Sequence, residues 1–303
     1  MFKVNFISMP VLKNMYSLNH SKIHSIFKNV INVEYNDKLV SIQNSNVPKG
    51  PLSISINDSV NFLDLPVKVG DVITIKKDVI CIGSISVNIE RPLIWNPRLK
   101  DYFLLSKNKE QINKLKNIVI LYGKSGGIKE EVLSIIADNQ ETLKYKNKEN
   151  IVRALNEAYK DFYNKKQNDA SAKLSSLIGY GAGLTPAGDD FLVGVMSVLH
   201  CFKKLDIPLL ELYEKLSNEI LKNSHKTTTV SKTFLEEAAE ERFSESFHKL
   251  YEALWNKNSE ELYKAAISMI SIGHSSGTDG LCGLLWGFYL ISNLKIMEDS
   301  YGS

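Results

Sequence analysis

The chain has 303 residues, 44% of them apolar and 23% charged, which is typical of a globular protein with a sizeable core. Its formal net charge is only +3, and its lysines are scattered among acidic residues. The sequence contains no basic stripe interleaved with aromatic residues, which argues against nucleic-acid binding. Its three cysteines form no CxxC motif, so the sequence favours a reducing compartment over a disulfide framework.

The chain is also predicted to have no membrane segment. The N-terminus lacks the apolar region of a signal peptide. The longest apolar runs, Phe191–Leu199 and Leu281–Ile291, are too short to span a bilayer and are typical of core helices. These features predict a cytoplasmic protein.

Residues from about Val30 to Ile89 have the pattern of short β-strands separated by turn signals such as Asn57-Asp58. The expected strands are Val30–Tyr35, Leu39–Gln43, Leu52–Ile56, Val72–Ile75 and Val79–Ile89. Short strands at such close spacing predict a small barrel or sandwich.

From Asp101 onward the apolar spacing becomes helical. The expected helices are Asn150–Tyr163, Lys173–Ile178, Asp189–Phe202, Leu209–Leu221, Thr233–Leu254, Ser259–Ile270 and Gly280–Ile291. Thr233-Phe234-Leu235-Glu236 is a capping-box pattern that predicts a helix start at Thr233. We therefore predict an α+β protein with a β-rich N-terminal domain over residues 1–100 and a helical domain over residues 101–303.

The segment Gly179–Asp190 reads GYGAGLTPAGDD. Its alternating glycines permit unusual backbone conformations and let a ligand approach the main chain. Thr185 followed by Pro186 predicts an N-cap and a first helical position, and the N-terminus of such a helix suits an anion. The alternative is a tight loop between packed helices, with the two aspartates complementing the helix dipole. The glycine spacing fits neither a dinucleotide motif nor an ordinary P-loop.

The segment Gly273–Gly280 reads GHSSGTDG and again leads into an apolar helix. His274 lies in this loop among hydroxyl groups and near Asp279, so a functional and a purely structural histidine are equally supported. Gly280, Gly283 and Gly287 fall near one helical face, which predicts close helix–helix packing.

Three weaker features favour structural interpretations. The hydroxyls of Thr227–Ser231 can bind phosphate or carboxylate oxygens, but this stretch alone favours a plain inter-helix loop. Gly123-Lys124-Ser125 lacks the upstream glycine of a P-loop and is predicted to be a turn. The isolated histidines without metal-ligand spacing are predicted to be structural: His20, His24, His200 and His248.

The two glycine-rich segments resemble the signature blocks of the AllH-like family, the H subunit of the oxamate carbamoyltransferase encoded with allantoin-degradation genes. The strings concerned are GYGAGLTPAGDDFLVG from Gly179 and GHSSGTDGLCG from Gly273. The resemblance implies carbamoyl transfer between oxalurate or oxamate and phosphate or carbamoyl phosphate. It also implies other subunits of the same complex as partners, and a small carboxylated or phosphorylated substrate.

The resemblance, combined with the chemistry of the matching positions, predicts the site residues. His274, Asp189 and Asp279 are the expected catalytic residues. The expected substrate-binding residues are Gly181, Gly183, Thr185, Gly188, Asp190, Thr227, Ser231, Ser276 and Thr278.

The sequence departs from ordinary carbamoyltransferases because it has no S-T-R-T loop, and its arginines lie outside the glycine motifs. Helix N-termini, hydroxyls, Lys226 and His274 must then hold the anion. The aspartates repel an anion unless Mg²⁺, a protonated group or an outward orientation intervenes. Two alternatives therefore stay open: a non-catalytic ligand-binding or scaffolding subunit, and a metal-dependent helical hydrolase.

Overall fold

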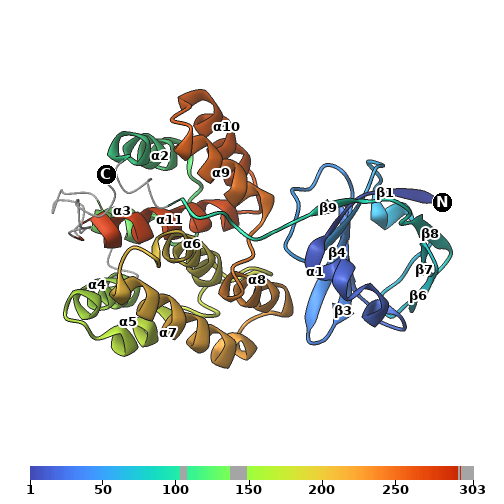
Figure 1. Ribbon diagram of the computed structural model, residues 1–303, viewed down its shortest axis with the longest axis horizontal. Coiled ribbons are helices and arrows are strands. Elements are labelled where there is room, and N and C mark those ends of the chain that lie inside the picture. Colours follow the sequence, from blue (N-terminus) through green and yellow to red (C-terminus); the bar gives the residue numbers. More distant parts are fainter. Residues whose placement is uncertain (103–107, 137–148, 293, 295–303) are drawn as a thin grey trace, which may run out of the picture. The chain divides into compact units, whose positions relative to one another are not determined.

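The computed structural model describes residues 1–102, 108–136, 149–292 and 294. Within them the chain forms two compact units, of which one is Met1–Arg98 with Arg242–Glu245 and the other is Leu99–Glu241 with the chain from Ser246 onward. The first unit is rich in β-strands and the second is helical (Figure 1). This division of secondary structure confirms the predicted α+β class.

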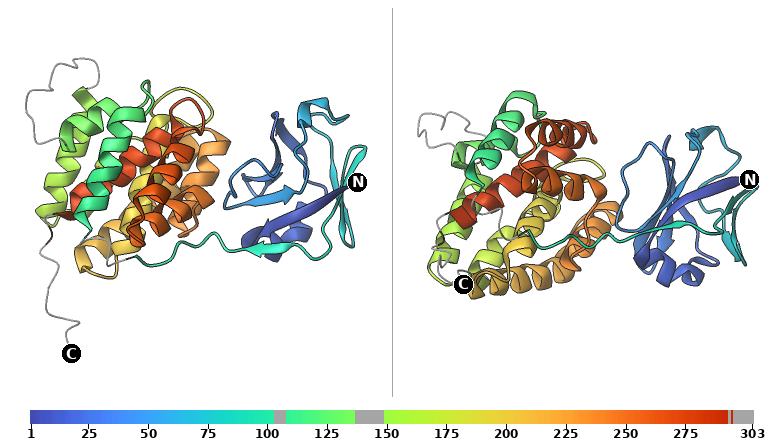
Figure 2. Two further views of the ribbon diagram at one scale, coloured as in Figure 1. Left: turned by 90° about the horizontal axis from the view of Figure 1, so that it is seen from above. Right: turned by 45° about the horizontal axis from the view of Figure 1, so that its top comes forward.

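The β-rich unit is a curled sheet that nearly closes into a barrel (Figure 2). Its elements are β1 (Phe2–Ser8), α1 (Met9–Lys13), η1 (Met15–Leu18), β2 (Ile23–Ile26), β3 (Val30–Tyr35), β4 (Lys38–Gln43), β5 (Ser53–Ile56), η2 (Phe62–Asp64), β6 (Ile73–Lys76), β7 (Val79–Ile82), β8 (Ile85–Asn88) and β9 (Leu93–Trp95). The strand order is β2-β3-β4-β5-β1-β8-β7-β6, with β9 paired to β1. The first and last strands of this order come close together. The Ile73 N–H, in β6, donates to Ser21 O, just before β2, at 2.8 Å.

Local sequence explains the turns of this sheet. β3 and β4 form a hairpin through Asn36 and Asp37, whose φ angles of 43° and 60° belong to the left-handed region that a two-residue hairpin turn requires. Gly83, with φ 54°, turns the chain between β7 and β8. The predicted strand Val79–Ile89 is therefore two strands.

The sequence prediction omits β1, β2 and β9. β1 is central, since it pairs with β5, β8 and β9. Its pairing depends on partners far along the chain, and seven residues at an N-terminus give little periodic signal of their own.

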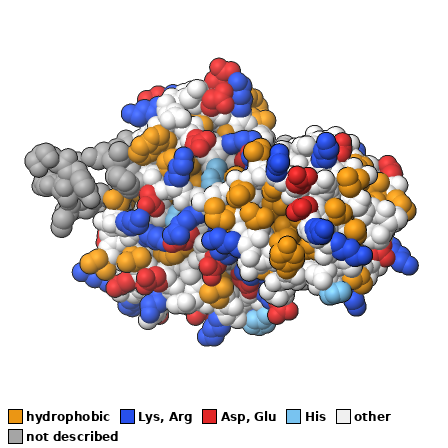
Figure 3. Space-filling model, turned by 45° about the vertical axis from the view of Figure 1, so that its right-hand side comes forward, with side chains coloured by type: hydrophobic (Ala, Val, Ile, Leu, Met, Phe, Trp, Pro, Cys, Tyr) orange, Lys and Arg blue, Asp and Glu red, His pale blue; other side chains and the backbone are white. Residues whose placement is uncertain are grey.

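The helical unit consists mainly of α2 (Lys109–Tyr122), α3 (Lys129–Ile136), α4 (Glu149–Tyr163), α5 (Gln167–Ser175), α6 (Ala187–Phe202), α7 (Ile207–Asn223), η5 (Ser224–Lys226), α8 (Thr229–Ala239), α9 (Glu245–Trp255), α10 (Ser259–Ile270) and α11 (Ser276–Ser292). Among the described residues, no helix combines the length and the apolar character needed to cross a membrane. On the face shown in Figure 3, Lys and Arg side chains are interspersed with Asp and Glu.

The helix predicted over Thr233–Leu254 is wrong in two respects. The predicted helix Thr233–Leu254 is two helices, α8 and α9, separated by residues 240–244. The capping box at Thr233 does not start a helix. Thr228 is the N-cap of α8, because its hydroxyl accepts the Ser231 N–H at 3.1 Å, whereas the Thr233 hydroxyl donates within the helix to Thr229 O.

The short predicted helix Lys173–Ile178 is displaced from the observed one. The observed helix, α5, begins at Gln167 and ends at Ser175, and residues 176–178 form turns that lead into the first glycine-rich segment.

Helices α6 and α11 pack against each other (Figure 2). The close approach predicted for the glycines of α11 is confirmed at Gly283 and Gly287. A Cβ atom at Gly283 would lie 1.9 Å from Phe191 O, and one at Gly287 would lie 2.8 Å from the Val198 Cβ. These contacts advance in the same direction along both helices, so the two helices run parallel. Their N-termini therefore lie at the same end of the unit.

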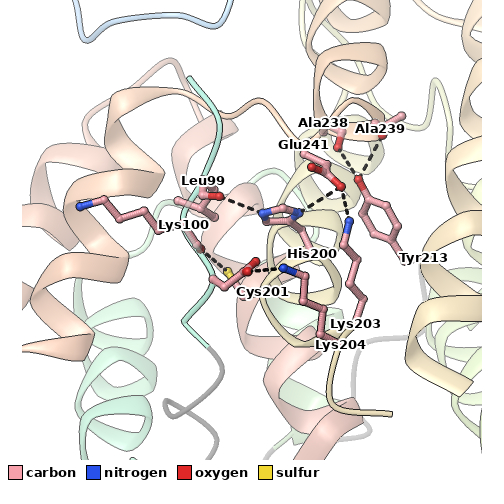
Figure 4. Close-up of polar contacts among 11 residues, drawn as sticks. Leu99, Lys100, His200, Cys201, Lys203, Lys204, Tyr213, Ala238, Ala239 and Glu241 are labelled. Atoms are coloured by element: carbon pink, nitrogen blue, oxygen red, sulfur yellow. Dashed lines mark hydrogen bonds and ion pairs between the residues drawn. The ribbon is translucent and has the colours of Figure 1, made fainter. Parts of the chain in front are cut away.

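A buried polar cluster anchors the start of the helical unit (Figure 4). The His200 ring, 2% exposed, hydrogen-bonds through Nε2 to Leu99 O at 2.9 Å. Its Nδ1 lies 3.9 Å from Glu241, which is also paired with Lys203. Burial lowers the pKa of His200, while the backbone contact at Leu99 and the Glu241 carboxylate oppose that effect. The structural role predicted for this histidine fits these contacts.

Gly283→Ala is expected to reduce the free energy of unfolding by at least about 2 kcal/mol, because the added methyl group forces α6 and α11 apart. Gly50→Ala is the matched control, since its Cβ would meet only ordinary contacts beginning at 3.7 Å. Chemical denaturation measures the free energy of unfolding of both variants. Equal stabilities of the two variants would show that the helices tolerate separation.

His200 is expected to make the helical unit less stable as the pH falls below about 6.5. The pKa of His200 is lower in the folded chain than in the unfolded chain, so the unfolded state takes up the proton first. Acidification therefore stabilises the unfolded state relative to the folded state. The contribution of neutral His200 to stability is complete above the pKa that this histidine has in the unfolded chain, and it is lost as the pH falls below that value.

Thermal unfolding between pH 7.5 and pH 5 tests this, at pH values chosen around the ordinary histidine pKa of about 6.5. His200→Gln keeps a donor for Leu99 O and cannot become charged, so its melting temperature is expected to vary less with pH. The exposed His225→Gln is the control. An unchanged slope in His200→Gln would contradict the assignment.

Candidate functional site

Four loops of the helical unit are linked in series by hydrogen bonds, some of them through the first turns of α6 and α11, and each loop leads into the N-terminus of a helix. We call them the first glycine loop (residues 179–186, before α6), the second glycine loop (residues 271–275, before α11), the GKSGG loop (residues 123–128, before α3) and the threonine loop (residues 227–228, before α8). A helix N-terminus carries unpaired N–H groups and a partial positive charge, so each of these loops ends at a partial positive charge.

The two glycine-rich segments meet directly. The Thr185 and Ser276 hydroxyls are 2.7 Å apart and hydrogen-bonded. The sequence prediction of Thr185 as N-cap is wrong, because Pro186 occupies the N-cap position of α6 and α6 begins at Ala187. Thr185 is thereby left to contact the other segment.

Asp189 holds the first glycine loop and the threonine loop together. It is 1% exposed. Its Oδ1 accepts the Gly179 N–H at 2.8 Å and its Oδ2 accepts the Thr227 hydroxyl. Burial raises the pKa of Asp189, and the hydrogen bonds from Thr227, Gly179 and Ser231 counteract part of that rise. Both carboxylate oxygens thus serve the loop backbone and its hydroxyls.

The threonine loop has a second contact with the first glycine loop, from the Thr228 hydroxyl to Leu184 O at 2.6 Å. Thr227 and Ser231 are the residues of this region expected to bind substrate. In this structure the Thr227 hydroxyl donates to Asp189, and Ser231 lowers the pKa of Asp189.

The GKSGG loop is the part of the region that the sequence prediction missed, since it was interpreted only as a turn. The Lys124 N–H donates to the Thr278 hydroxyl at 3.0 Å, and the Lys124 ammonium donates to Gly273 O at 2.8 Å. The Ile128 N–H donates to Asp279 Oδ1 at 2.8 Å. The only local signal was the pair of adjacent glycines ahead of a helix.

Those glycines leave room for the second glycine loop. A Cβ atom at Gly127 would lie 2.0 Å from Asp279 Oδ1, and one at Gly126 would lie 3.2 Å from Cε1 of His274. Asp279 and Thr278 are fully buried, whereas His274 is exposed. The predicted catalytic histidine is therefore accessible, while Asp279 positions the GKSGG loop.

The glycines of the segment Gly179–Asp190 differ in their surroundings. A Cβ atom at Gly188 would lie 2.1 Å from Leu177 O, and one at Gly181 would lie 2.7 Å from Ala187 N. Gly183 is different: its φ is 102°, it is exposed, and no atom lies within 4 Å of the Cβ position. Gly188 and Gly181 permit tight packing, whereas Gly183 leaves its main chain open to a ligand.

Asp190 is in a distinct environment. Its Oδ2 is buried without a hydrogen-bond partner among the described residues. Burial raises the pKa of this carboxyl well above its ordinary value, the Asp279 and Asp189 charges raise it further, and hydrogen bonds from Ser276 and Thr185 lower it. As expected for neighbours on a helix, the two aspartates have different surroundings.

The described residues contain no group of three or more His, Cys, Asp and Glu side chains placed to hold a metal ion. The oxygens of Asp189 and Oδ1 of Asp279 already accept hydrogen bonds from the loops. These carboxylates fit loop positioning better than they fit the ligand shell of Mg²⁺.

The sequence matches two family models, which together define the class of this protein. Residues 177–288, which carry most of the loops, match the model described as oxamate carbamoyltransferase subunit AllH. Residues 5–93 match the model of the AllH family N-terminal domain. The chain belongs to the AllH family, whose description as an enzyme subunit implies further subunits. No solved structure matches the chain.

Asp189→Ala is expected to lower the free energy of unfolding by about 2 kcal/mol, because the half-buried Gly179 N–H and the Thr227 hydroxyl lose their acceptors. Asp189→Asn is expected to lower it less, since the amide keeps one acceptor oxygen. Asp169→Ala, an exposed aspartate in the first turn of α5, is the control. Denaturant unfolding measures the series, and equal stability of Asp189→Ala and the control would show that the loops do not depend on this carboxylate.

Proposed function

We propose that the helical unit supplies the binding site for the small anionic substrate of an oxamate carbamoyltransferase complex. The observation that carries the proposal is the hydrogen bond between Thr185 and Ser276 at the parallel N-termini of α6 and α11. Two aligned helix N-termini at one place attract a carboxylate or phosphate more strongly than either does alone.

The loops supply the remaining contacts that an anion requires. Gly183 leaves its backbone accessible, and Thr185 offers a hydroxyl. The Lys124 ammonium donates to Gly273 O, and the Lys226 carbonyl oxygen would lie 2.8 Å from a Cβ atom at Gly179. In this proposal, the ammonium groups of these two lysines replace an arginine clamp. Oxamate and carbamoyl phosphate are both small anions that hydroxyls and N–H groups can bind.

In this proposal, the exposed His274 polarises the carbamoyl carbonyl or exchanges a proton with the substrate. Asp189 and Asp279 act on the reaction by holding the loops. The other subunits complete the reaction. The proposed compartment is the cytoplasm, and the proposed pathway is allantoin degradation. The free cysteines agree with a reducing compartment.

The test is carbamoyl transfer from carbamoyl phosphate to oxamate by the complex reconstituted with this chain. Omitting the chain is expected to abolish transfer, and His274→Ala is expected to lower kcat/KM about 100-fold. His24→Ala, in the β-rich unit, is the control. Titration calorimetry of the chain with oxamate measures binding separately.

Full activity without the chain would overturn the proposal. Loss of activity on omission, combined with full activity of His274→Ala and no binding of oxamate, would instead support the scaffolding alternative.

A further inference from the structure

The GKSGG loop is fixed by hydrogen bonds on both sides of Gly126. Before this glycine, the Lys124 N–H donates to the Thr278 hydroxyl at 3.0 Å. After it, the Ile128 N–H donates to Asp279 Oδ1 at 2.8 Å. Thr278 and Asp279 are fully buried in the first turn of α11. Both sides of Gly126 are therefore tied to the core of the helical unit.

The main chain that leads into His274 is tied to the same loop. The Lys124 ammonium donates to Gly273 O at 2.8 Å and to Ser271 O at 3.4 Å. Gly273 has a φ of 61°, which a glycine adopts without strain. The backbone directly before His274 is thus held beside the GKSGG loop.

The imidazole of His274 lies against Gly126. A Cβ atom at Gly126 would lie 3.2 Å from Cε1 and 3.6 Å from Nδ1 of His274. No hydrogen bond joins the ring to any other group in the described part of the chain. The residue is otherwise exposed. One edge of the ring therefore rests on the glycine, and its orientation depends on packing instead of on a hydrogen bond.

A side chain at position 126 would occupy space that the ring now uses. Carbon atoms in ordinary contact are about 3.5–4.0 Å apart, so a methyl group at 3.2 Å from Cε1 would make the ring give way. Gly126 also has a φ of 102°, which other residues rarely adopt. Both the space and the backbone conformation require a glycine.

We propose that Gly126 is a positioning residue for His274. The fixed GKSGG loop supports one edge of the imidazole and directs the exposed part of the ring toward the carbamoyl group. This inference rests on the proposed function, in which His274 polarises the carbonyl or exchanges a proton. That role needs a ring nitrogen within about 2.6–3.2 Å of the reacting atom, so the orientation of the ring sets the rate.

Gly126→Ala tests the proposal in the reconstituted complex, with kcat and KM for oxamate as the measured quantities. The added methyl group displaces the imidazole, and kcat is expected to fall about 10-fold, because a misplacement of about 1 Å can cost about 100-fold. KM is expected to change little, since Gly126 acts through His274. Gly70→Ala is the matched control: Gly70 has a φ of 88°, and no atom lies within 4 Å of its Cβ position.

Two further measurements separate positioning from a general structural effect. Adding Gly126→Ala to His274→Ala is expected to cause no further loss of kcat, because the ring on which Gly126 acts is already absent. In the uncomplexed full-length chain, a nuclear Overhauser effect is expected between the Cε1 proton of His274 and the α protons of Gly126. This second measurement reports the contact without any activity.

Wild-type kcat in Gly126→Ala, beside a loss of activity in His274→Ala, overturns the positioning role and leaves the proposed function intact. Equal losses in Gly126→Ala and Gly70→Ala, additive losses in the double variant, or an absent Overhauser effect also overturn the positioning role alone. Full activity of the complex without this chain overturns both the positioning role and the proposed function.

Discussion

The close parallel contact of α6 and α11 is the constraint on which the candidate site depends. Parallel neighbouring helices place two partial positive charges side by side, an arrangement that is unfavourable unless something compensates it. Here the first turns of both helices carry aspartates, Asp189 and Asp190 on α6 and Asp279 on α11. These acidic residues are thus part of what permits the helices to lie together, and Gly283 lets the backbones approach.

The loops are held by buried carboxylates and main-chain groups more than by apolar packing. Asp189 joins the first glycine loop to the threonine loop, and Asp279, in the first turn of α11, holds the GKSGG loop. Each carboxylate is shielded from water, so its hydrogen bonds are strong and directional. This arrangement fixes the backbone while leaving exposed groups such as Gly183 and His274 at the surface.

The sequence was informative where its signal was local. The alternating glycines, hydroxyls and aspartates identified both glycine-rich segments, and the apolar spacing identified α6 and α11 within a few residues. The GKSGG loop was missed because its importance lies in the bond from Ile128 to Asp279, which are 151 positions apart. The central strand β1 was missed for the same reason, since its partners lie in distant segments.

The short segment between α8 and α9 has a consequence for dissecting the protein. The Phe243 N–H donates to Pro97 O and the Glu245 N–H donates to Lys49 O, so four residues from the C-terminal half complete the β-rich unit. The polypeptide therefore passes from one unit to the other three times, near residues 98, 241 and 245. A gene fragment that stops at residue 100 would leave those two carbonyl groups without their donors. Splitting the protein into independently expressed halves requires a short graft of residues 242–245 rather than a single cut.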